Sequence, residues 1–133
     1  MIRPGITFLL WLALAAFIVL NDAVGDIWIG QALSVRAAEW YKVLVPLPYA
    51  AMLAVIHARR TAGPQWLGAA VLAAILWPTS TAVVDFLYLR VTYDAVPEAF
   101  LDRFGGPYPV LLFALFALPL VAGAALRGAG RTA

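Results

Sequence analysis

Residues 108–126 form a run without a single charged side chain, YPVLLFALFALPLVAGAAL. Three further stretches of the 133-residue chain are almost as apolar: residues 6–29, 40–56 and 65–89. A helix that crosses the hydrocarbon core of a bilayer needs about 20 predominantly apolar residues. We therefore expect an all-α integral membrane protein, a single domain that consists of an antiparallel four-helix bundle.

The overall composition supports this class and excludes several kinds of site. The chain is 65% hydrophobic and only 12% charged, whereas soluble domains carry about 25% charged residues. It has no cysteine and one histidine, His57, so disulfides and thiolate metal sites are excluded. Neither the H-E-x-x-H metal spacing nor a phosphate loop occurs. We expect no metal and no cofactor, and the small net charge of +2 does not predict nucleic-acid binding.

The charged residues indicate how the chain lies in the membrane. All seven acidic residues fall at one side of the predicted bundle: Asp22, Asp26, Glu39, Asp85, Asp94, Glu98 and Asp102. The other side holds both termini and the short basic connection at 57–64, with no acid at all. Positively charged loops favour the cytoplasm. We expect both termini in the cytoplasm and the acidic loops on the outer face of the plasma (inner) membrane.

Asp85 is the strongest candidate for a functional group. Residues at helical spacing before it are mostly small or carry a hydroxyl: Ala70, Ala74, Pro78 and Thr81. Such a stripe is typical of a helix–helix interface in lipid, so Asp85 should point into the bundle. It would then be a site for a ligand, an ion or acid–base catalysis, or a packing carboxylate paired with Lys42 or Arg90.

A second acidic pair lies near the end of the first predicted span. Asp22 and Asp26 are four residues apart, which places them on one face of a continuous helix, and Asn21 adds an amide. The alternative is that the helix ends here, with Gly25 as the breaker and Asp22 in solvent.

The second predicted span carries Lys42, Tyr49 and His57 at nearly heptad spacing. They would form one polar stripe that lines a cavity or relays protons, or they are separate groups with Lys42 and His57 at the two interfaces. Pro46 and Pro48 interrupt the helical phase between them.

These groups suggest one pocket near the outer leaflet. We expect the following side chains to reach a similar depth and to be ligand- or ion-binding candidates: Asn21, Asp22, Asp26, Lys42, Thr81 and Asp85, with Tyr49 deeper in the span. Residues 97–104, between the last two spans, form a short amphipathic segment. It would lie either on the membrane surface or folded over the bundle.

Three functions fit these features. The first is a non-catalytic subunit within a larger membrane assembly, favoured by the small size and the lack of a catalytic motif. The second is a homo-oligomeric transporter of a small solute or ion, in which Asp22 and Asp85 bind a cation or proton. The third is a membrane-embedded isomerase or cyclase for a lipid or isoprenoid, with Asp85 or Asp22 as its acid. The expected partners are the lipid bilayer and either other membrane subunits or further copies of the chain.

Overall fold

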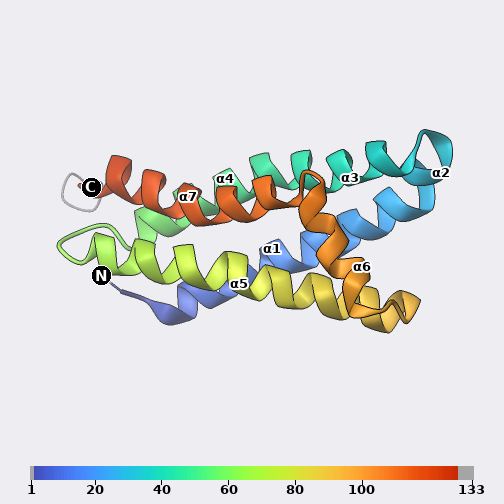
Figure 1. Cartoon of the computed structure of the whole chain (residues 1–133). Coiled ribbons are helices and arrows are strands. Elements are labelled where there is room, and N and C mark those ends of the chain that lie inside the picture. The colour runs from blue at the N-terminus through green and yellow to red at the C-terminus, as the bar shows by residue number, and fades with distance from the viewer. Residues whose placement is uncertain (1, 129–133) are drawn as a thin grey trace.

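The computed structural model describes residues 2–128, in which short turns connect helices (Figure 1). The elements in chain order are α1 (Pro4–Val24), the π-helical turn η1 (Gly25–Ile29), α2 (Gly30–Ala32), α3 (Val35–Leu44), α4 (Pro46–Arg60), α5 (Trp66–Tyr93), α6 (Pro97–Asp102), the 3₁₀ turn η2 (Arg103–Gly105) and α7 (Tyr108–Leu126). The described part of the chain is therefore all-helical.

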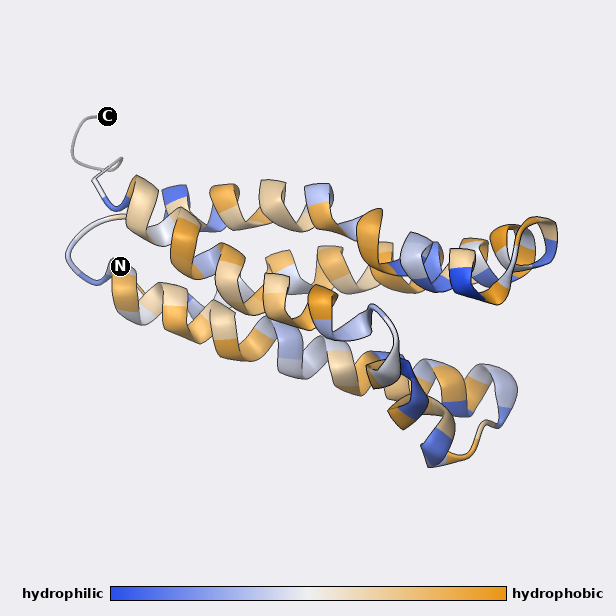
Figure 2. Ribbon diagram, turned by 45° about the horizontal axis from the view of Figure 1, so that its top comes forward, coloured by the Kyte–Doolittle hydropathy of each residue, from blue (hydrophilic) through white to orange (hydrophobic). Residues whose placement is uncertain are grey.

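Four helical stretches are long and apolar enough to cross a membrane: Pro4–Ala32, Val35–Arg60, Trp66–Tyr93 and Tyr108–Leu126. They overlap the four stretches predicted from the sequence, and the first three extend beyond the predicted bounds. Large apolar side chains stand exposed along them, such as Phe113 with 69% and Val121 with 65% of the residue exposed. Orange segments run along all four in Figure 2. Such surfaces suit contact with a lipid bilayer.

Proline and an αL residue explain where two of the helices end. Pro46 has no amide hydrogen to continue the ladder, so Val45 separates α3 from α4 within the second span. At the far end of α5, Asp94 takes the left-handed conformation with φ 49° and its amide bonds to the carbonyls of Arg90 and Leu89. This is a typical helix C-terminus.

The long helices pack in a ring in which α1 contacts α4 and α5, and α7 contacts the same two helices. Small residues bring α5 and α7 close together. A Cβ atom built on Gly123 would lie only 3.1 Å from the Cβ of Ala70. Close approach at small residues replaces the hydrophobic effect as a source of helix association in lipid.

The start of α1, the end of α7 and the α4–α5 connection lie at one end of the molecule, and α2 and α6 lie at the other (Figure 1). We call the latter the acidic end. There α6 lies across α5 and η2 leads into α7, with Phe100 of α6 packed edge-to-face on Phe86 and Tyr108. The segment 97–104 therefore folds over the bundle, although Leu101 remains exposed.

Candidate functional site

Two carboxyl groups are buried side by side within the bundle toward the acidic end. Asp22 of α1 is 1% exposed and Asp85 of α5 is 0% exposed. The two carboxyl groups lie near enough to influence each other electrostatically, so α1 and α5 together create what we call the buried acid pair. Ionisable groups are rare at such positions because of the cost of burying charge, and they commonly mark functional sites.

Asp85 is held by residues from the other end of the chain. The Tyr108 hydroxyl, at the start of α7, donates a hydrogen bond of 2.5 Å to Asp85 Oδ2. Arg103 Nη1, on η2, lies 3.8 Å from the same oxygen, and the Arg103 guanidinium stacks 4.1 Å from the centre of the Tyr108 ring. The ion pair is loose, whereas the phenol bond is short. The partners expected from the sequence, Lys42 and Arg90, bond elsewhere: Lys42 to Asp26, and Arg90 to Asp94 and the Ala95 carbonyl.

The buried acid pair is short of hydrogen-bond donors. Asp22 Oδ1 and Oδ2 and Asp85 Oδ1 have none among the residues of the described chain. The Thr81 hydroxyl, one helical turn before Asp85, is also buried without a partner in residues 2–128. A hydrogen bond between the two carboxyl groups would require one of them to carry a proton. Buried polar atoms without partners are uncommon and call for an explanation such as a bound ion or a chemical role.

Asp26, one turn after Asp22, forms with Lys42, Tyr88 and Tyr93 what we call the Asp26 cluster. Its Oδ1 lies 2.5 Å from Lys42 Nζ. Its Oδ2 accepts hydrogen bonds from the hydroxyls of Tyr93 and Tyr88, at 2.8 and 3.0 Å. Gly25 makes this approach possible, because a Cβ there would meet the Lys42 side chain at 3.3 Å.

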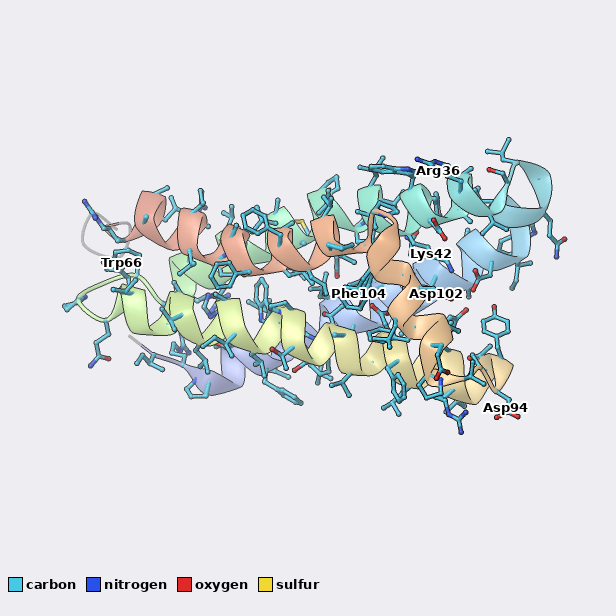
Figure 3. All side chains as sticks on the ribbon, in the orientation of Figure 1. Arg36, Lys42, Trp66, Asp94, Asp102 and Phe104 are labelled. Atoms are coloured by element: carbon cyan, nitrogen blue, oxygen red, sulfur yellow. The ribbon has the colours of Figure 1, made fainter. Side chains whose placement is uncertain are left out.

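A hollow of about 360 Å³ opens beside the Asp26 cluster. Its lining includes Asp26 and Lys42 of the cluster, together with Glu39, Tyr88 and Arg103. We call it the Arg103 pocket. Figure 3 shows Lys42 and Phe104 between the helices at this end, while Arg36 and Asp94 lie at the periphery. Because Arg103 also reaches Asp85, it connects the pocket to the buried acid pair.

The other predicted candidates lie apart from this centre. Asn21 is buried, and its side-chain amide donates to the Tyr41 carbonyl at 3.5 Å. Tyr49 stacks on Phe17 with ring centres 4.5 Å apart. His57 is buried toward the opposite end of the second span, where its Nε2 lies 2.7 Å from the Thr7 hydroxyl. The structure thus gives Lys42, Tyr49 and His57 three separate sets of contacts.

Sequence reasoning singled out Asp22 and Asp85 but missed the two residues that hold Asp85. In the sequence, Tyr108 looked like an ordinary aromatic residue at the membrane interface, and Arg103 looked like a basic residue in a loop. The only signal was local: Arg103 stands between Phe100 and Phe104, in a segment whose aromatic residues needed something to pack against.

The buried acid pair, the Asp26 cluster and the Arg103 pocket thus share the acidic end. No group of three or more metal-ligating His, Cys, Asp or Glu residues occurs among residues 2–128. Comparisons with protein-family models, with curated proteins and with solved structures give no match to this chain. What the site does must therefore be inferred from its own chemistry.

Proposed function

We propose that this small membrane protein transports a small solute in exchange for, or together with, a proton that is bound by the buried acid pair. The observation that carries the proposal is the position of Asp22 and Asp85, which are buried within the bundle with three carboxylate oxygens that lack donors. A proton shared by the two carboxyl groups would supply one of the missing hydrogen bonds.

The charges that face the pair support reversible rather than permanent protonation. Arg103 of η2 faces Asp85 at 3.8 Å, and Lys42 of α3 is bound to Asp26 one turn away from Asp22. Tyr108 donates to Asp85 from α7. These groups favour the ionised pair, whereas burial and the adjacent like charge favour the protonated pair. Such a balance suits a group that must both take up and release a proton.

The other hypotheses receive less support. A packing role for Asp85 would be favoured by a tight ion pair, and Arg103 lies at 3.8 Å. An acid–base enzyme needs a substrate cavity that opens onto its acid, but the Arg103 pocket is lined by Asp26 and Glu39 rather than by Asp22 or Asp85. The role as a subunit of a larger assembly and the oligomeric state both stay predictions.

The first experiment detects the proton itself. Infrared spectra of the purified protein in lipid nanodiscs should contain the C=O stretching band of a protonated carboxyl group. We expect the variants Asp22→Asn and Asp85→Asn to lose that band. Asp94→Asn is the matched control, because the Asp94 side chain is 96% exposed and asparagine tolerates the αL conformation equally well. A band absent from the wild type, or present in both variants, would overturn the proposal.

The second experiment tests transport. Proteoliposomes that contain a pH-sensitive dye are mixed with the small molecules that dialysis separates from a cell extract. We expect the extract to drive proton movement through the wild-type protein and through Asp94→Asn, but not through Asp85→Asn. Equal proton movement in all three would show that the buried acid pair is not part of the path.

A further inference from the structure

The Arg103 pocket contains two opposite charges that are not paired with each other. Glu39, on α3, makes no hydrogen bond or ion pair within residues 2–128, and it lines the pocket together with Arg103. The Arg103 side chain is 15% exposed, and within residues 2–128 its only ion pair is the one with Asp85 at 3.8 Å. By contrast, Asp26 and Lys42 bond to each other. The negatively charged carboxylate of Glu39 and the positively charged guanidinium of Arg103 are therefore available to a ligand.

The surroundings hold these two groups in place. The Glu39 carboxylate rests against the backbone that joins η2 to α7, since a Cβ on Gly106 would lie 3.0 Å from Glu39 Oε2. Arg103 is fixed by its stacking on Tyr108. A small void of about 10 Å³ also lies between Glu39, Arg103 and Tyr108, which is room for about one water molecule. The two charges are thus preorganised rather than free on the surface.

We propose that the Arg103 pocket binds a small zwitterion, which carries an ammonium group and an acidic anion a few bonds apart. The anion would bind the guanidinium of Arg103, whose planar fork matches a carboxylate, and the ammonium group would bind Glu39. A hollow of about 360 Å³ is at the lower end of the usual range for ligand sites, which favours a ligand of amino-acid size. A free solute and an ethanolamine lipid headgroup share this chemistry.

The inference rests on the proposed function and adds a means of coupling. Arg103 is shared between the zwitterion and Asp85. A ligand anion that binds the guanidinium where it stands offsets the positive charge that faces Asp85, so the buried acid pair holds its proton more tightly. Coupling of this kind is reciprocal, so a bound proton frees Arg103 for the ligand.

Binding is tested on the whole protein in nanodiscs of phosphatidylglycerol, which contain no amine headgroup. The probes are glycine, β-alanine and taurine, with methylamine and acetate as ligands of single charge. We expect at least one zwitterion to bind and both single-charge probes to bind far more weakly. Arg103→Gln and Glu39→Gln should each weaken binding about tenfold to a hundredfold. Binding by none of the three zwitterions, or equal binding by acetate or methylamine, would overturn the proposal.

Matched controls come from exposed residues outside the pocket. Arg36→Gln and Glu98→Gln remove the same charges at exposed positions of α3 and α6, and neither should change binding. Equal losses in the controls and in the pocket variants would also reject the site. A soluble short-chain phosphatidylethanolamine distinguishes the sources, since binding of this lipid alone would assign the pocket to a headgroup and overturn a solute site.

The two proposals can fail separately. Zwitterion binding that depends on Arg103 and Glu39, without the infrared band of a protonated carboxyl group, would support the binding pocket and reject the proton site. The infrared band without zwitterion binding would support the proton site and reject the binding pocket.

Discussion

Replacement of Asp22 by asparagine should stabilise the protein at alkaline pH and change little at mildly acidic pH. When the buried acid pair holds no proton, Asp22 and Asp85 are two adjacent anions in a buried site. In general, two like charges about 4 Å apart repel by about 4 kcal/mol at an effective dielectric constant of about 20, and the repulsion falls as their separation grows. Attraction to Arg103 and Lys42 offsets part of this, so we expect a net gain of about 1–4 kcal/mol, as for other buried charges that are replaced.

The sign depends on the proton. At acidic pH a shared proton already removes the repulsion in the wild type, so Asp22→Asn offers no gain there. Raising the pH removes the proton from the wild type alone, and its thermal unfolding midpoint should fall while that of the variant stays level. Tryptophan fluorescence during heating in nanodiscs, at several pH values, measures both curves. The reasoning is refuted if Asp22→Asn is less stable than the wild type at alkaline pH, or if Asp94→Asn behaves in the same way.

Two further predictions concern packing and the Asp26 cluster, and heating in nanodiscs measures both. Gly123→Ala should lower the unfolding midpoint, because its Cβ would lie 3.1 Å from that of Ala70 and overpacking costs about 1–3 kcal/mol; Gly5→Ala, with nothing within 4 Å, should not. Lys42→Met should cost about 1–3 kcal/mol by leaving Asp26 without its cation, and adding Asp26→Asn should recover much of that loss. A double variant no more stable than Lys42→Met would contradict this account.

The apolar runs of the sequence predicted the four long helices, but not where they end. Residues 30–39 fall between two of the predicted spans, whereas α2 and the first half of α3 lie there. Hydropathy reports where apolar side chains stop, and a helix whose backbone groups bond to one another continues past that point. Ser34 restarts the helix, since its hydroxyl accepts a hydrogen bond from the Ala37 amide at 3.0 Å.

The candidate site was predictable where it depended on one helix. The small residues that precede Asp85 correctly indicated its inward direction, and Asp85 is buried. Its bond to Tyr108 joins residues 23 positions apart and depends on the packing of α7 against α5. Gly25 was a possible helix breaker in the sequence, but it lies within a continuous helical stretch and lets Lys42 approach.

The π-helical turn after Asp22 contains one residue more than an α-helical turn of the first span would. The amide of Gly30 bonds to the carbonyl of Gly25, five positions earlier, whereas an α-helix would use the fourth. Each residue of an α-helix turns the chain by about 100°. If the π-helical turn moved one turn along the span, the side chains that it passes would rotate about the helix axis. Nearly all backbone hydrogen bonds would remain formed. Asp22 lies one turn before the π-helical turn. Such a rotation would turn its carboxylate toward a different neighbouring helix without unfolding the span.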